Sequence, residues 1–156
     1  MSRFSTAKPS RFAALFLLPV IFGTAAAMAQ APKVPLPKIS LSAGIHLIHA
    51  EVASDDASRA YGLMFRKHLE PTNGMLFEFP QADIQCFWMR NTLIPLSAAF
   101  IADDGSVVNI EDMAPRTDTP HCSEQPVRYV LEMNQGWFAQ RGIGKNAVIK
   151  GLPSQP

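Results

Sequence analysis

The chain has 156 residues and a formal net charge of +1, with 47% hydrophobic and only 17% charged residues. This length fits one domain, and the composition excludes a highly charged disordered chain and a basic nucleic-acid-binding protein. Two cysteines are too few for a disulfide-built scaffold or a four-thiolate metal site.

The N-terminal segment has the pattern of a secretory signal peptide. Arg3, Lys8 and Arg11 precede an apolar stretch over residues 12–22, and a run of small residues ends at Ala29. We predict that residues 1–29 are cleaved off. An uncleaved membrane anchor is the alternative, although the apolar stretch is shorter than the ~20 residues that span a bilayer.

Cleavage would remove three cations and no acid, which leaves a net charge of −2. A slightly acidic chain is not expected to bind nucleic acid or an anionic membrane surface. After cleavage no segment is expected to insert stably into a membrane, and the predicted location is the periplasm or the medium.

Export determines how the two cysteines are interpreted. Cys86 and Cys122 would enter an oxidising compartment, where a single pair of cysteines favours one disulfide. Such a bridge would contribute about 3–4 kcal/mol in the chain-entropy model. Two separate, buried thiols are the alternative.

The predicted domain begins with a strand and a helix. Residues 30–38 are proline-rich and predicted to form a linker, and residues 39–153 are predicted to form one domain. Its first predicted strand covers residues 44–52. A helix is expected next, with Ser54 as its N-cap, acids in its first turn and cations up to His68 at its end.

Short strands dominate the remaining chain, and residues 136–141 are expected to form one helical turn. Asp103-Asp104-Gly105 is typical of a β-hairpin, and prolines are expected to end strands. The predicted strands cover residues 75–79, 84–90, 96–102, 107–110, 127–133 and 147–149, with a polar loop over residues 115–126. We therefore expect a mainly β (α+β) fold, a small β-sandwich or barrel-like domain with one to two short helices.

No metal site or cofactor is predicted. His46 and His49 are three residues apart in a predicted strand, which places them on opposite faces. The five methionines beyond residue 29 stand singly among apolar residues, so we expect them to fill the core rather than to bind copper.

Two features could bind a small ligand, the first being a pair of arginines. Arg59 and Arg66 are seven residues apart on the predicted helix and would share one face. Two guanidinium groups on one face can hold an anion. A solvated helix face is the alternative.

The second feature is the segment Cys86–Thr92. Strand alternation would place Trp88 and Arg90 on one face, directly before the polar pair Asn91 and Thr92. An aromatic surface beside amide, hydroxyl and guanidinium groups is typical of a site for a small polar ligand or a sugar. Alternatively, Asn91 and Thr92 satisfy backbone groups in a tight loop.

Several segments stand in a recognisable order: Gly62–Arg66, Gly74–Phe79, Phe87–Leu96, Phe100-Ile101 before Asp104-Gly105, and Val130–Glu132 before Gly136 and Gly142-Ile143. Together they resemble the domain-of-unknown-function 192 family over residues 40 to 151. The resemblance implies a small, often exported, mostly β domain of sandwich or barrel type, and implies no activity, cofactor or substrate. Ser97 stands where the family usually has aspartate, and Lys145-Asn146 where it often has glycine-aspartate, so no chemistry that needs those acids is expected.

Three functions are compatible with the sequence. The favoured one is a non-enzymatic periplasmic small-ligand-binding or accessory protein, whose site joins residues 88 and 90–92 with the two arginines. Its partner would be a small polar or anionic ligand or an envelope protein. The second is a cell-envelope hydrolase that uses Ser123, His121 or Glu132. The third is a structural partner-binding module, which predicts a large exposed apolar patch and no concave polar pocket.

Overall fold

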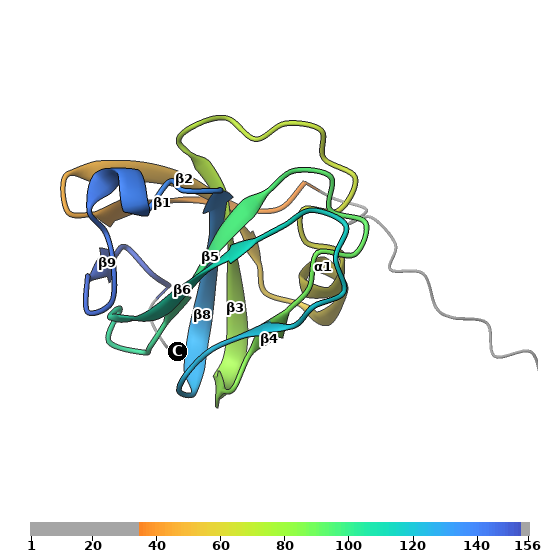
Figure 1. The fold of residues 1–156 in the computed structure, drawn as a ribbon. Coiled ribbons are helices and arrows are strands. Elements are labelled where there is room, and N and C mark those ends of the chain that lie inside the picture. The colour runs from red at the N-terminus through yellow and green to blue at the C-terminus, as the bar shows by residue number, and fades with distance from the viewer. Residues whose placement is uncertain (1–34, 154–156) are drawn as a thin grey trace, which may run out of the picture.

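The computed structural model describes residues 35–153, which form one strongly curled seven-stranded sheet, a two-stranded sheet, one short α-helix and one 3-10 helix (Figure 1). The 3-10 helix, η1 (Ala139–Arg141), lies within the predicted helical turn over residues 136–141. The large sheet has the order β6-β5-β8-β3-β2-β1-β9. Its strands are β1 (Lys38–Ala43), β2 (His46–Ala53), β3 (Asn73–Asp83), β5 (Leu96–Ile101), β6 (Val107–Met113), β8 (Val127–Asn134) and β9 (Ile149–Lys150). The small sheet pairs β4 (Cys86–Phe87) with β7 (His121–Cys122). The predicted mainly β class and barrel-like form are confirmed.

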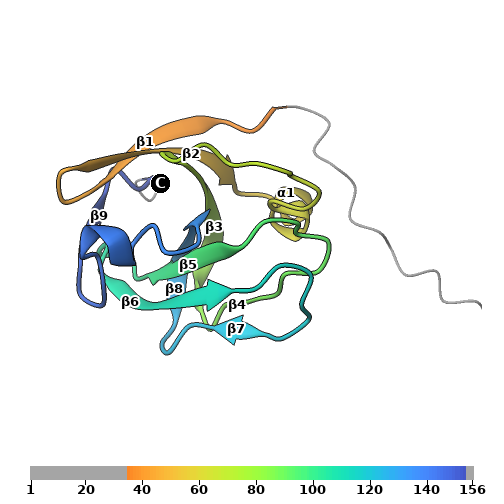
Figure 2. The same cartoon turned by 45° about the horizontal axis from the view of Figure 1, so that its top comes forward.

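The sheet curls far enough for its two ends to meet, as Figure 2 shows from above. β9 pairs with β1, while the residues just before β9 pair with the start of β6 through a bridge between Ser106 and Val148. The Ile149 amide also donates to the carbonyl of Gly105, at 2.9 Å. Gly105 has a φ of +85°, and a Cβ atom there would lie 2.6 Å from the Ile149 oxygen, so this hairpin position requires glycine.

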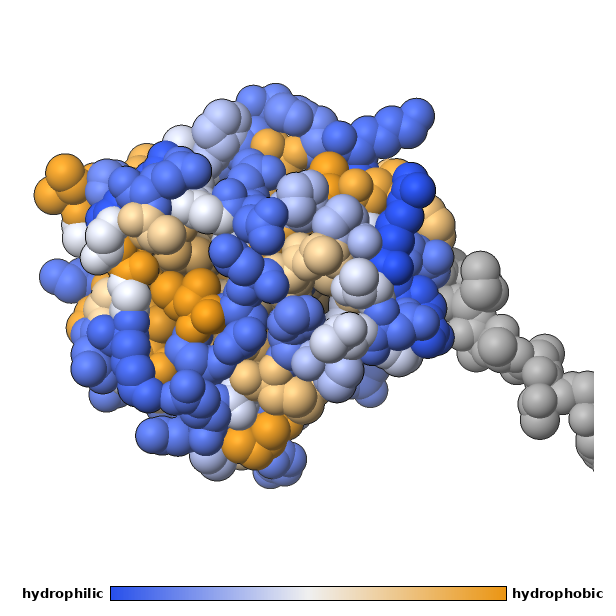
Figure 3. Space-filling view, in the orientation of Figure 1, coloured by the Kyte–Doolittle hydropathy of each residue, from blue (hydrophilic) through white to orange (hydrophobic). Residues whose placement is uncertain are grey.

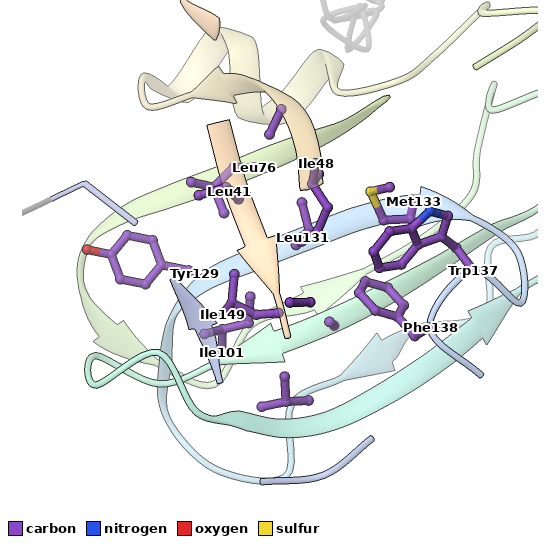
Figure 4. Close-up of a cluster of buried hydrophobic side chains, with 14 residues drawn as sticks. Leu41, Ile48, Leu76, Ile101, Tyr129, Leu131, Met133, Trp137, Phe138 and Ile149 are labelled. Carbon is purple, nitrogen blue, oxygen red and sulfur yellow. The ribbon is translucent and has the colours of Figure 1, made fainter. Parts of the chain in front are cut away.

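Hydrophobic residues pack on both faces of the central strands. Every residue of β5 is buried, and so are seven of the eight residues of β8. Figure 4 shows the cluster inside the curl, which includes Leu41, Ile48, Tyr129, Leu131 and Phe138. A second cluster covers the outer face and includes Leu63, Met75, Phe77, Met89, Leu96, Phe100 and Val130. Four of the five methionines that were expected to fill the core are completely buried.

The helix is shorter than predicted. α1 covers Asp56–Tyr61 and is capped by Asp55, whose carboxylate accepts from the Ser58 amide at 3.0 Å, instead of by Ser54. The helix ends at Gly62, which has a φ of +50° that a helix does not allow. The predicted helical run to His68 is therefore wrong.

Several strand boundaries also differ from the prediction. β1 lies ahead of the first predicted strand, and only its first residue, Lys38, belongs to the predicted linker; its pairing with β2 outweighs its polar composition. β3 continues past Pro80 through an irregularity in its pairing between Glu78 and Asp83, where a proline is tolerated. The predicted strand over residues 84–90 shrinks to β4, whose partner β7 lies in the predicted loop.

The predicted disulfide between Cys86 and Cys122 is confirmed, and the two cysteines face each other across the small sheet. No helix within residues 35–153 is long and apolar enough to cross a membrane. The predicted signal peptide lies outside the described residues.

The two departures from the family pattern have structural explanations. Ser97 is buried in β5, where its hydroxyl donates to the Asp112 carboxylate and accepts from the Gly136 amide, at 2.8 Å. A carboxylate at position 97 would face that of Asp112. Asn146 has a φ of +68°, which asparagine tolerates better than most residues.

Candidate functional site

A cavity of about 560 Å³ lies over the outer face of β3 and β8. Its walls come from α1 and the turn after it, from β3, and from the segment that runs through β4 to Thr92. Six aromatic side chains line it: Tyr61, Phe65, Phe77, Phe79, Phe87 and Trp88. This volume and aromatic lining suit a small organic molecule.

Glu132 lines this cavity from the middle of β8. Because side chains alternate along a strand, Glu132 shares the outer face with Val130, while Leu131 and Met133 point into the curl. The Glu132 side chain is buried and accepts no hydrogen bond from any described residue. Burial raises the pKa of this carboxyl to about 8. The cavity therefore holds a carboxyl group that is mostly protonated at neutral pH.

Trp88 and Arg90 form one exposed edge of the cavity. The Trp88 ring is 51% exposed, and the Arg90 guanidinium lies 4.3 Å from its centre. Arg90 donates through Nε to the Asp118 carboxylate at 2.9 Å, and this contact lowers the pKa of Asp118. The tryptophan is thus held in a stacked position at the cavity edge.

Arg59 also lines the cavity, from α1. Its guanidinium donates to the carbonyls of Ser54 and Glu78 and to the Asp56 carboxylate, and it lies 5.3 Å from the centre of the Phe79 ring. These contacts fasten the helix to β3 and occupy most of the guanidinium donors. Arg59 is therefore a structural part of the cavity wall.

Asn91 and Thr92 complete the polar side of the cavity. Asn91 has a φ of +61°, its carbonyl accepts from the Phe65 amide at 2.9 Å, and its side-chain amide approaches the Met64 sulfur at 3.9 Å. Thr92 is buried, and its hydroxyl makes no hydrogen bond with another described residue. Backbone groups therefore hold this loop, and the Thr92 hydroxyl is available to a ligand.

Arg66, the sixth predicted site residue, does not line the cavity. Its guanidinium pairs with both carboxylate oxygens of Glu51 on β2, at 2.8 and 2.6 Å. That contact lowers the pKa of Glu51. The expectation that Arg59 and Arg66 share a helix face is wrong because α1 ends at Tyr61.

The three residues proposed for a hydrolase are not brought together. Ser123 accepts from the Gln85 amide at 3.1 Å, and His121 lies 3.6 Å from Glu111. Neither lines the cavity that holds Glu132.

The sequence-based site included four of the polar residues but omitted Glu132 and most of the aromatic wall. One signal for Glu132 was available: it is the single acid in the run from Tyr129 to Met133, a strand that is otherwise apolar. Acids are rarely fully buried without a partner, so such a position indicates a special role. No local signal indicated that α1 and β4 would lie on the same side of β8.

Comparisons with known proteins agree with this fold. The DUF192 family (Uncharacterized ACR, COG1430) matches residues 39–151. No curated protein matches this chain.

Two solved structures are similar over most of the chain. A Sinorhizobium meliloti 1021 protein, described as a "putative transcription regulator", is 34% identical with a TM-score of 0.72, over 77% of this chain and 98% of that protein. A protein of unknown function from Novosphingobium aromaticivorans DSM 12444 is 37% identical with a TM-score of 0.72, over 81% of this chain and 94% of that one. The extent of the family match and these similarities establish that the chain belongs to the DUF192 family.

Proposed function

We propose that this chain is an exported, non-enzymatic binding protein whose small-molecule ligand occupies the cavity over β3 and β8. One observation carries the proposal: Glu132 is a buried carboxyl that faces an aromatic cavity and has no hydrogen-bond partner among the described residues. An unpaired buried polar group is costly, so its position in the wall of a cavity supports a ligand that pairs with it.

The chemistry of the cavity supports binding rather than hydrolysis. Its described lining contains one acid and no histidine, lysine, serine or free thiol, since Cys86 is in the disulfide. The face shown in Figure 3 is mostly hydrophilic, with hydrophobic residues in separate small patches. This surface and the concave cavity give less support to a purely structural module.

Two features support a location outside the cytoplasm: the predicted signal peptide and the disulfide between Cys86 and Cys122. The description of the Sinorhizobium relative names transcription regulation. The predicted charge of −2 after signal cleavage does not favour a nucleic-acid partner for this chain.

The proposal can be tested with two tryptophan substitutions on α1. Ala60 lines the cavity mouth, whereas Ala57 is exposed on the same helix and does not line the cavity. A thermal-shift screen of small organic molecules on residues 30–156 should yield compounds that stabilise the protein and change the fluorescence of Trp88. We expect Ala60→Trp to weaken their binding at least tenfold and Ala57→Trp to leave it unchanged.

Equal loss of binding in both variants would show that the compounds bind elsewhere on the helix. Unchanged binding in both would exclude the cavity as the site. Arg66→Met provides a further control, because Arg66 lies outside the cavity.

A further inference from the structure

The charged groups that line the cavity differ in whether they have partners. Arg59 is paired with Asp56 and with two carbonyls, and Arg90 is paired with Asp118. Within residues 35–153, Glu132 is the one charge-bearing lining group that has no such partner. Both arginines of the cavity wall are thus neutralised by carboxylates of the chain, whereas Glu132 has no positively charged partner among the described residues.

The aromatic lining favours a positive group as well. Aromatic faces carry partial negative charge and attract cations. This chain already stacks its own guanidinium groups on Trp88 and Phe79. Phe77 and Phe87 line the same cavity and pack edge to face, with their ring centres 4.8 Å apart. No arginine or lysine of the described chain stacks on either of these two rings.

We propose, on the basis of the binding function proposed above, that the ligand is a small organic cation with N–H groups, such as a primary amine on an apolar body. Its charged nitrogen would donate to the Glu132 carboxylate, and its body would contact Phe77 and Phe87. The N–H requirement follows from Glu132 itself, which needs a hydrogen-bond donor as well as a positive charge. A fully substituted ammonium group would satisfy only the charge.

Binding of a cation beside Glu132 should release a proton, and this release can be measured. Burial raises the pKa of Glu132 to about 8, so the free protein holds a proton there at neutral pH. A cationic ligand stabilises the ionised carboxylate, and its binding must release that proton to the solvent. Affinity should therefore rise as the pH increases from 6 to about 8, by up to tenfold per unit.

The groups around Glu132 do not obscure this readout. The residues paired with it on β3 and β5 are Met75 and Ala98, which do not titrate. The cavity lining adds Arg59 and Tyr61 from α1 and Arg90 from the opposite wall. Arginine stays protonated throughout this range, and tyrosine ordinarily titrates near pH 10.

The experiment compares three probes of similar size on residues 30–156: benzylamine, benzyl alcohol and benzoate. Binding is measured by calorimetry and by Trp88 fluorescence at pH 6, 7 and 8, in buffers of different ionisation enthalpy. We expect benzylamine to bind at least tenfold more tightly than the other two at pH 8 and to release close to one proton per site at pH 6 to 7.

Two variants locate the effect. Glu132→Gln should remove both the preference for the amine and the proton release. Glu70→Gln changes an exposed acid outside the cavity and should leave both intact. If Glu132→Gln does not fold, the proton release of the unmodified protein and its dependence on pH still decide the question.

The outcomes separate this inference from the binding function. Tighter binding of benzyl alcohol or benzoate, or amine binding without proton release, would overturn the cation inference and leave the cavity as a binding site. Failure of all three probes to bind also overturns the inference, whereas the binding function is judged by the comparison of Ala60→Trp with Ala57→Trp.

Discussion

The carboxyl group of Glu132 is buried in a way that reduces the stability of the folded chain. Its carboxyl is 4% exposed and has no hydrogen-bond partner among the described residues, and burial raises its pKa to about 8 from 4.5. In the unfolded chain the same carboxyl loses its proton near its ordinary pKa. Folding is therefore opposed by the cost of protonating or desolvating this group whenever the pH is above about 4.5.

This difference predicts how stability depends on pH. Between pH 4.5 and 8 the folded state holds one more proton at Glu132 than the unfolded state, so the free energy of unfolding falls as the pH rises and levels off above 8. The slope reaches at most about 1.4 kcal/mol per pH unit. In urea denaturation across this range, Glu132→Gln should lack this slope and exceed the unmodified protein in stability at pH 8.

Asp103→Asn serves as the control, because this exposed acid lies outside the cavity and forms no ion pair with another described residue. The prediction concerns the difference between each variant and the unmodified protein, which cancels the titration of other groups. A pH-independent difference for Glu132→Gln would show that the carboxyl is not held in its protonated form.

At the scale of elements, β3 and β8 approach each other closely at Gly74. A Cβ atom on Gly74 of β3 would collide with the Met133 sulfur and lie 2.6 Å from the Glu132 carbonyl oxygen of β8. The methionine could move, but the backbone oxygen belongs to the strand pairing that places the Glu132 side chain. Glycine at this position therefore keeps the two strands in register.

Gly74→Ala should lower the free energy of unfolding by about 1–3 kcal/mol, through overpacking between the strands. Gly144→Ala is the matched control, because a Cβ atom there meets nothing within 4 Å, and it should stay within about 0.5 kcal/mol of the unmodified protein. Urea denaturation measures both variants. Equal effects of the two substitutions would contradict the proposed packing constraint.

The small sheet of β4 and β7 depends on its disulfide. Two residues in each strand provide few backbone hydrogen bonds, whereas the bond between Cys86 and Cys122 closes a loop across a sequence separation of 36. β4 also carries Phe87 and is followed by Trp88, both of which line the cavity. The disulfide therefore contributes to the cavity wall as well as to stability.

Replacing both cysteines by serine should lower the free energy of unfolding by about 3–4 kcal/mol, as the chain-entropy model gives for a loop of this size. A reducing agent should lower the stability of the unmodified protein in the same way and have no effect on the double variant. Urea denaturation with and without reductant checks this. Equal stability of the oxidised and reduced protein would refute a stabilising role for the bond.

At the scale of the whole molecule, curling turns one sheet into a structure with two cores. The interior of the curl is filled by one hydrophobic cluster, and the outer face of the central strands by another. The second cluster is covered by a short helix and by the irregular segment through β4, and these leave the cavity. The fold thus places a rigid sheet on one side of the site and loops on the other, an arrangement common for binding sites.

The whole chain is also predicted to be exported and processed. Protein recovered from the periplasm should begin at Gln30 and contain no free thiol, as measured by mass spectrometry and thiol titration under denaturing conditions. A charge within the apolar stretch, as in Leu17→Arg, should retain the uncleaved chain in the cytoplasm with both cysteines reduced. Recovery of uncleaved protein from the envelope would instead indicate an anchor.

Sequence-based prediction succeeded where the signal is local or tied to the compartment. The hairpin at Gly105 and the buried strand β8 depend on neighbouring residues, and the disulfide follows from two cysteines in an exported chain. It failed where distant contacts decide. Arg66 pairs with Glu51 on β2, which no local spacing indicates. The end of α1 is a different case, because Gly62 is a local stop signal that the prediction passed over.

The candidate site shows the same division. The sequence by itself determined the fold class, the family, the disulfide and the segment from Trp88 to Thr92 that forms one wall of the cavity. Only the tertiary structure brought α1 and β4 over the outer face of β8, and only this arrangement buries Glu132 at a cavity wall with no hydrogen-bond partner among residues 35–153. The physical reason is that burial and the supply of hydrogen-bond partners are set by residues far apart in the chain, whereas strand alternation and turns are set by immediate neighbours.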